Sequence, residues 1–193
     1  MVIPLANLSF MAFARQRGTR TPLDREQLME YALKSLGARM QSVRDLRRKL
    51  SDRAEPGPSG TEAVDWVLAK LQELRYLSDD RFAADFTRLR QENRSFGRRR
   101  VQQDLQAKGI APEVIQTTLD EAYEGVDEQA LVRQHLERRR IASPTDEKST
   151  ARVLRRLTAA GFSSKAIFAV LRSLKSGDDA LDRAEADASD DQT

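Results

Sequence analysis

The chain has 193 residues, which is enough for one or two ordinary domains or for a short array of small units. Only 6% of the residues are aromatic, so each small unit has few large side chains with which to close a core, and it is expected to bury apolar surface against its neighbours. There is no cysteine, which excludes disulfides, thiolate metal sites and thiol nucleophiles, and the net charge of +3 conceals an acidic end on a basic body.

The first 23 residues contain Pro4, Gly18 and Pro22 without a sustained apolar period, and they are predicted to be mostly disordered. The apolar run from Met1 to Ala14 is too short to cross a membrane. In a signal peptide the basic residues precede the apolar run, whereas here they follow it. We therefore expect a cytoplasmic protein that does not associate with membranes.

Three helices are predicted next, and they span residues 25–36, 42–53 and 62–74, the last beginning after Thr61. Gly37 is expected to end the first helix. Ser42 is expected to cap the second, with the Asp45 carboxylate reaching back as in a capping box. The link from Ala54 to Gly60 contains glycine and proline and is predicted to be a loop.

Six further helices are predicted, over residues 78–93, 98–108, 112–124, 127–139, 146–159 and 163–175. Ser78 precedes the first of these, and Pro112 occupies the first turn of the third. No stretch of alternating β-branched residues interrupts this pattern. The predicted fold class is therefore all-α, with nine helices in three groups of three.

One apolar pattern occurs three times along these helices. Its first part is the pairs Leu46/Leu50, Val101/Leu105 and Val153/Leu157. Its second part is the stripes Val64, Leu68, Leu71; Ile115, Leu119, Ala122; and Ile167, Leu171, Leu174. The copies are separated by 55 and 52 residues in the first part and by 51 and 52 in the second. This regularity predicts three tandem three-helix repeats, at residues 24–76, 77–125 and 126–175, whose function lies on a long surface.

An acidic tail is predicted to follow, over residues 176–193. From Asp178 onward it has seven acidic residues and one basic residue, Arg183, for a net charge of −6, so the preceding residues carry +9. A basic body favours a polyanionic partner such as nucleic acid. Two interpretations of the tail stay open: it competes for the basic surface, or it is a disordered end that aids solubility.

No set of residues predicts catalysis or a bound cofactor. Asp79 and Asp80 are adjacent carboxylates, but neighbours on a helix point about 100° apart, and in a first turn they offset the helix dipole. His135, the one histidine, has no triad or metal motif beside it and is expected on a helix surface. The glycines lack the sequence of a phosphate-binding loop. We expect a protein that is not an enzyme and that holds neither metal nor cofactor.

The candidate binding residues are basic and recur on or beside the middle helix of each repeat. They are Arg44, Arg47, Arg48, Arg98, Arg99, Arg100, Lys108, Arg138, Arg139, Arg140, Arg152, Arg155 and Arg156. The planar guanidinium group suits phosphates and carboxylates. The alternative is a solvated helix face neutralised by nearby Asp and Glu; recurrence in three repeats favours binding.

Several of these segments together resemble the RecX family of recombination regulators. Repeat one matches at Arg39, Ser42, Asp45-Leu46 and Leu50. The junction RYLSDDRFA (Arg75 to Ala83) and the segment GRRRVQQDLQAKGI (Gly97 to Ile110) are the specific matches, and repeat three matches more weakly, through Arg138 to Arg140, Asp146, Lys148, Leu157 and Gly161-Phe162. Arg75 stands where the family prefers glycine, and Ala159-Ala160 replace a pair that is often basic.

The resemblance implies three three-helix repeats in an elongated, curved array. It implies a monomeric negative regulator of homologous recombination and DNA repair that binds RecA filaments on single-stranded DNA and inhibits RecA ATPase and strand exchange. The basic residues above would then contact acidic RecA surface or DNA phosphates. A second hypothesis is a DNA-binding protein that uses its helical triplets in helix-turn-helix fashion without RecA, on single- or double-stranded DNA.

Overall fold

The computed structural model describes residues 21–174, so the predicted acidic tail and most of the predicted disordered start lie outside the described residues. The labelled helices are α1 (Arg25–Ala38), α2 (Val43–Ser51), α3 (Pro58–Glu73), α4 (Asp79–Arg94), α5 (Arg98–Ala107), α6 (Pro112–Tyr123), α7 (Glu128–Arg138) and α8 (Glu147–Ala159). A further helix, called the last helix below, occupies residues 164–174. Within this range the only β pairing is one isolated bridge between Leu23 and Ala54, so the all-α prediction is confirmed.

The helices form three triplets, each with its own buried apolar cluster. The first triplet is α1–α3, the second is α4–α6, and the third is α7, α8 and the last helix. Leu77, which precedes α4, packs in the first cluster, and Phe96 contacts both the second and the third. Apart from Ala122, the residues of the predicted pairs and stripes lie in or against these clusters as expected, and the clusters share little with one another. The repeat boundaries 24–76, 77–125 and 126–175 stay a prediction.

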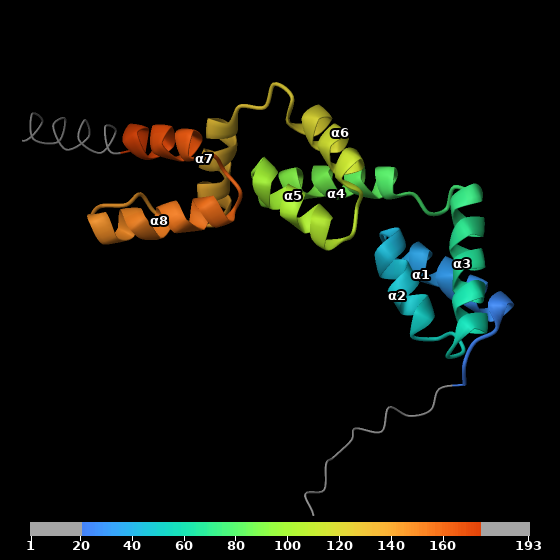
Figure 1. Ribbon diagram of the computed structural model, residues 1–193. Coiled ribbons are helices and arrows are strands. Elements are labelled where there is room, and N and C mark those ends of the chain that lie inside the picture. Colours follow the sequence, from blue (N-terminus) through green and yellow to red (C-terminus); the bar gives the residue numbers. More distant parts are fainter. Residues whose placement is uncertain (1–20, 175–193) are drawn as a thin grey trace, which may run out of the picture.

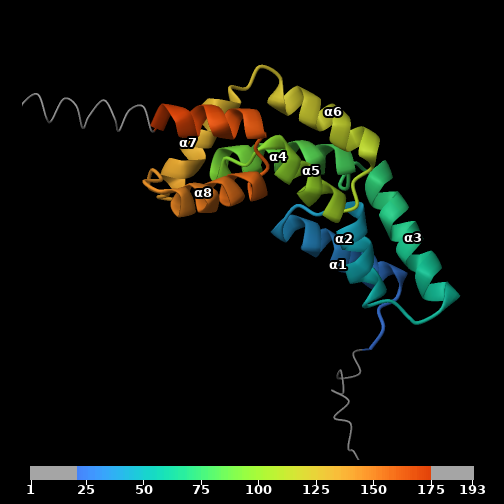
Figure 2. The same ribbon diagram turned by 60° about the vertical axis from the view of Figure 1, so that its left-hand side comes forward.

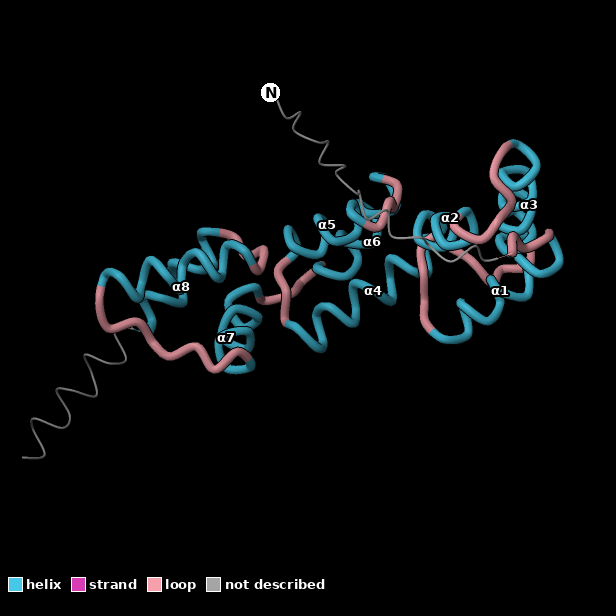
Figure 3. Tube along the Cα trace, turned by 90° about the horizontal axis from the view of Figure 1, so that it is seen from below, coloured by secondary structure: helices cyan, strands magenta, loops and turns pink. Residues whose placement is uncertain are grey.

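The triplets lie in a bent row rather than around a common centre (Figure 1, Figure 2). Seen from below in Figure 3, the middle helices α2, α5 and α8 lie along one side of the row, and the first helices α1, α4 and α7 lie along the other. The predicted elongated array is therefore confirmed. Because each triplet contacts only its neighbours, the row exposes a long surface.

Two predicted helix ends were wrong, and both involve glycine or proline. α1 continues through Gly37 to Ala38, because a glycine inside a helix costs only about 1 kcal/mol and does not by itself end it. α3 begins at Pro58 and not after Thr61, because the fixed φ of proline suits the first helical turn. Gly57, with φ of 108°, turns the chain immediately before it.

Candidate interaction surface and the joints between triplets

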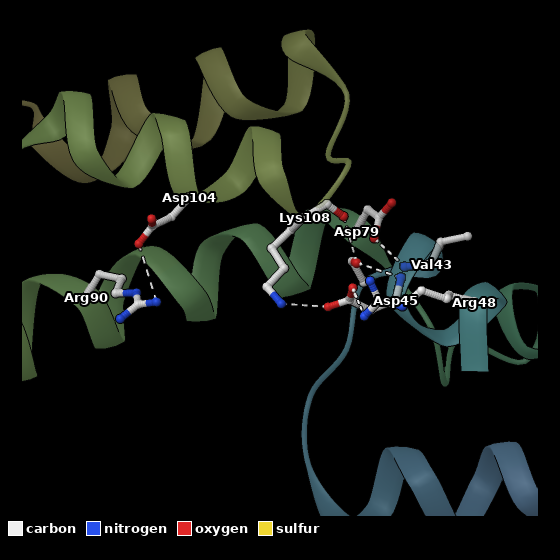
Figure 4. Close-up of polar contacts among 8 residues, drawn as sticks. Val43, Asp45, Arg48, Asp79, Arg90, Asp104 and Lys108 are labelled. Atoms are coloured by element: carbon white, nitrogen blue, oxygen red, sulfur yellow. Dashed lines mark hydrogen bonds and ion pairs between the residues drawn. The ribbon is translucent and has the colours of Figure 1, made fainter. Parts of the chain in front are cut away.

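Six of the thirteen predicted binding residues already have partners within the chain. The ion pairs are Arg47–Asp65, Arg48–Asp45, Arg98–Asp120, Arg100–Asp104 and Lys108–Asp45. Arg138 donates a hydrogen bond to the carbonyl of Glu92. Asp104 also pairs with Arg90, at 3.4 Å between Nη2 and Oδ2 (Figure 4). For the five ion-paired residues, the interpretation as a neutralised helix face describes the surroundings better than that of a free cation, whereas Arg138 keeps its charge and is held by a carbonyl oxygen.

The other seven are exposed arginines without an ion pair to any described residue. They are Arg44, Arg99, Arg139, Arg140, Arg152, Arg155 and Arg156. Five of them belong to the third triplet, where α8 buries Val153 and Leu157, as the sequence pattern predicts. The Arg152 charge lowers the pKa of Asp146 at longer range, after the stronger effect of the Ser149 hydrogen bonds. Among the predicted binding residues, those without an ion pair to the described part of the chain are therefore concentrated at the third triplet.

The first and second triplets are joined by side chains for which the sequence predicted other roles, a capping box for Asp45 and a partner contact for Lys108 (Figure 4). Lys108 Nζ lies 2.7 Å from Asp45 Oδ2, and Ser42 Oγ donates to the Lys108 carbonyl at 2.8 Å. Asp45 thus completes no capping box. Burial alone would raise the pKa of Asp45, but the hydrogen bond and the positive charge of Lys108 bring this pKa below its usual value. Lys108, predicted as a partner contact, has this structural role.

Asp79 also belongs to this joint. Ser78 caps α4, as predicted, by accepting a hydrogen bond from the amide of Arg81. The Asp79 carboxylate accepts from the Val43 amide at 2.9 Å, so it bonds the start of α2 as well as lying in the first turn of α4 (Figure 4). Partial burial raises the pKa of Asp79, which the Val43 hydrogen bond opposes.

The second and third triplets are joined through the backbone. Gly97 N donates to the Ala160 carbonyl at 2.9 Å, and Arg99 N donates to the Gly161 carbonyl at 3.3 Å. A Cβ on Gly97 would lie 2.4 Å from the Gly161 carbonyl oxygen, closer than side chains approach backbone. This joint therefore requires glycine on the second triplet.

His135 lies inside the same joint, and the prediction of a helix-surface position was wrong. Its side chain is buried, and Nδ1 lies 3.0 Å from the Arg94 carbonyl oxygen and 3.1 Å from that of Ser95. Since both partners can only accept, Nδ1 carries the proton. The ring contacts Phe96 and Phe162, at 6.0 and 5.5 Å between centroids. The sequence signal that indicates burial of His135 is its helical spacing from Val132 and Leu136, which are buried on the same face of α7.

We expect this histidine to make the protein less stable as the pH falls. Burial lowers the pKa of His135 below 6.5, more than the two carbonyl hydrogen bonds raise it. The unfolded chain therefore binds the proton first, and stability is lost as the pH falls below about 6.5, with a slope of at most about 1.4 kcal/mol per pH unit. Urea midpoints at pH 7.5 and 5.5 should differ in the wild type and differ less in His135→Gln. Equal differences in the two proteins would contradict this.

Within the described part of the chain, no helix is long and apolar enough to cross a membrane. The same residues contain no group of three or more His, Cys, Asp or Glu side chains placed to hold a metal ion.

Three helix triplets joined in a row, with exposed arginines on them, define an all-α repeat protein with an exposed basic surface. A family model described as RecX, second three-helix domain, matches residues 78–119. The regulatory protein RecX of Deinococcus radiodurans is 32% identical over 150 residues, which cover 78% of this chain and 69% of that protein. The one of Leptothrix cholodnii is 37% identical over 142 residues, which cover 73% and 85%. The chain belongs to the RecX family, as its sequence motifs indicate.

Solved structures agree on the fold. The crystal structure of RecX from Lactobacillus salivarius has a TM-score of 0.58 at 18% identity, and the similarity covers 79% of this chain and 97% of that one. A second crystal structure of regulatory protein RecX has a TM-score of 0.61 at 22% identity. The relatives are named as regulatory proteins, and this chain shares that general role.

Proposed function

We propose that this protein is a negative regulator of homologous recombination and DNA repair that binds RecA filaments on single-stranded DNA. It inhibits RecA ATPase and strand exchange by binding rather than by catalysis, and it acts as a cytoplasmic monomer without a cofactor. Membership of a family of regulators supports this role. A filament repeats its surface along its axis, which suits a row of like-built triplets.

The observation that carries the proposal is an exposed arginine, without an ion pair to any residue in the range 21–174, on the middle helix of every triplet: Arg44 on α2, Arg99 on α5 and Arg155 on α8. These helices lie along one side of the row (Figure 3). An arginine in an internal ion pair must lose that pair to bind a partner. All thirteen cations stay candidate contacts, but the seven unpaired arginines are expected to contribute most.

Reversing these three charges should weaken inhibition of RecA. The variant Arg44→Glu/Arg99→Glu/Arg155→Glu is compared with the wild type in a RecA ATPase assay on single-stranded DNA. Exposed charges at an interface are each worth about 0.5 kcal/mol, so the concentration for half-inhibition should rise by roughly tenfold. The difference should shrink as salt is added, because salt screens exposed charges.

The matched control reverses one exposed cation on the first helix of each triplet that, like the test residues, has no ion pair to a described residue, as Lys34→Glu/Arg94→Glu/Arg133→Glu. It changes the net charge equally on the other side of the row. If both variants lose potency equally, net charge and not the middle-helix side governs binding, and the proposed site is wrong. If neither loses potency while both stay folded, the proposed contacts are wrong.

The wild type and the two charge-reversal variants also distinguish the proposed RecA regulator from the second hypothesis, a DNA-binding protein that acts without RecA. Binding to duplex DNA without RecA that is sequence-selective and steeply dependent on salt would favour a RecA-independent DNA-binding protein.

A further inference from the structure

A pocket of about 380 Å³ opens beside the joint between the second and third triplets. Its lining includes Phe96, Ile141, Ala159, Ala160, Arg139 and Arg156. Ala159 and Ala160, at the end of α8, contribute only small side chains to this lining. Neither arginine has an ion pair with any described residue. Apolar walls beside two free cations suit an apolar side chain that is flanked by carboxylates.

Such a group occurs in this chain, outside the described residues. The segment Asp178-Asp179-Ala180-Leu181-Asp182 places one leucine among three aspartates. Leu181 is the only large apolar residue after Gly177, and the net charge from Asp178 onward is −6. Both the apolar group and the sign of the charge therefore complement the pocket.

The segment between residue 174 and Leu181 is long enough for Leu181 to reach the pocket. The last helix runs antiparallel to α8, so residue 174 lies toward the beginning of α8 and the pocket lies at its end (Figure 1). Its eleven residues span about 16 Å at 1.5 Å per residue. The seven residues from 174 to 181 can extend about 23 Å, which exceeds that return distance.

We propose that the acidic tail docks on the third triplet of its own chain, with Leu181 in this pocket and its aspartates against Arg139 and Arg156. The docked tail neutralises part of the surface where the unpaired arginines are concentrated. A polyanionic partner at this surface therefore competes with the tail. The inference does not rest on RecA as the partner, because its test is made on the protein alone.

The absence of native cysteine allows the contact to be trapped as a disulfide in the full-length chain. The pair Ala159→Cys/Ala180→Cys places one thiol in the pocket lining and one beside Leu181. The control pair Ala151→Cys/Ala180→Cys uses an exposed position near the start of α8, closer to residue 174. Under mild oxidation, we expect the Ala159 pair to close about tenfold faster, and Leu181→Ser to remove that advantage.

A second comparison tests whether the contact is local. Arg156 lines the pocket and Arg155, its neighbour, does not. Arg156→Glu should slow closure of the Ala159 pair more than Arg155→Glu, although both change the charge equally. Equal rates for the two cysteine pairs would mean that the tail is only tethered, and equal effects of the two reversals would mean diffuse attraction. Either result, or disulfides that join two copies, would overturn the proposal.

Discussion

Replacing Phe162 with alanine is expected to lower the free energy of unfolding of the third triplet by about 4 kcal/mol. The Phe162 side chain is 1% exposed and belongs to the apolar cluster of that triplet. It also meets the His135 ring edge-on, at 5.5 Å between centroids. Removing a buried phenylalanine ring costs its transfer free energy and leaves a cavity, in total about 3–5 kcal/mol. Urea unfolding followed by circular dichroism measures the change.

The matched control is Phe168→Ala in the last helix of the same triplet. Phe168 is 49% exposed, so the same chemical change should alter the free energy of unfolding by no more than about 0.5 kcal/mol. Similar losses in the two variants would mean that Phe162 is not the buried anchor of this triplet.

Replacing Gly161 with alanine is expected to cost about 3 kcal/mol and to open the joint between the second and third triplets. A Cβ there would lie 2.2 Å from the Arg100 backbone nitrogen, and the residue has φ of 90°, which L side chains rarely adopt. Overpacking and backbone strain each cost about 1–3 kcal/mol. Hydrogen exchange of the Gly97 and Arg99 amides, which donate across this joint, should become faster.

Replacing Gly37 with alanine is expected to change stability in the opposite direction from Gly161→Ala. Gly37 lies within α1, and a Cβ added there meets nothing within 4 Å. Alanine should therefore stabilise the protein by about 0.5–1 kcal/mol. If both alanine variants shifted the urea midpoint in the same direction, the distinction between the helical and the joint glycine would be wrong.

The helices and their buried faces could be predicted because their signals are local. The pairs Leu46/Leu50 and Val101/Leu105 face inward as the helical period requires, and Ser42 and Ser78 cap the helices they precede. The helix ends were predicted wrongly where one residue type is compatible with two local structures. Proline both breaks a helix and begins one, and Pro58 begins α3.

The joints could not be predicted because their partners are distant in sequence. Asp45 and Lys108 are 63 residues apart, and nothing near either residue indicates the other. Arginine spacing likewise predicts an exposed face but not the carboxylate that meets it, as Arg98 and Asp120 show across 22 residues. Which cations remain unpaired therefore depends on tertiary structure. Only His135 carried a local signal, its helical spacing from Val132, that could have corrected its assignment.

The junction at Gly97 and Gly161 has a consequence for how such a molecule evolves. Main chain meets main chain there, so the angle between the second and third triplets is set in part by backbone contacts that do not depend on exposed side chains. Exposed residues that make no contact across this joint can change while the spacing of the second and third triplets stays constant. Gly97 and Gly161 thus fix the distance between the contact points on the second triplet and those on the third.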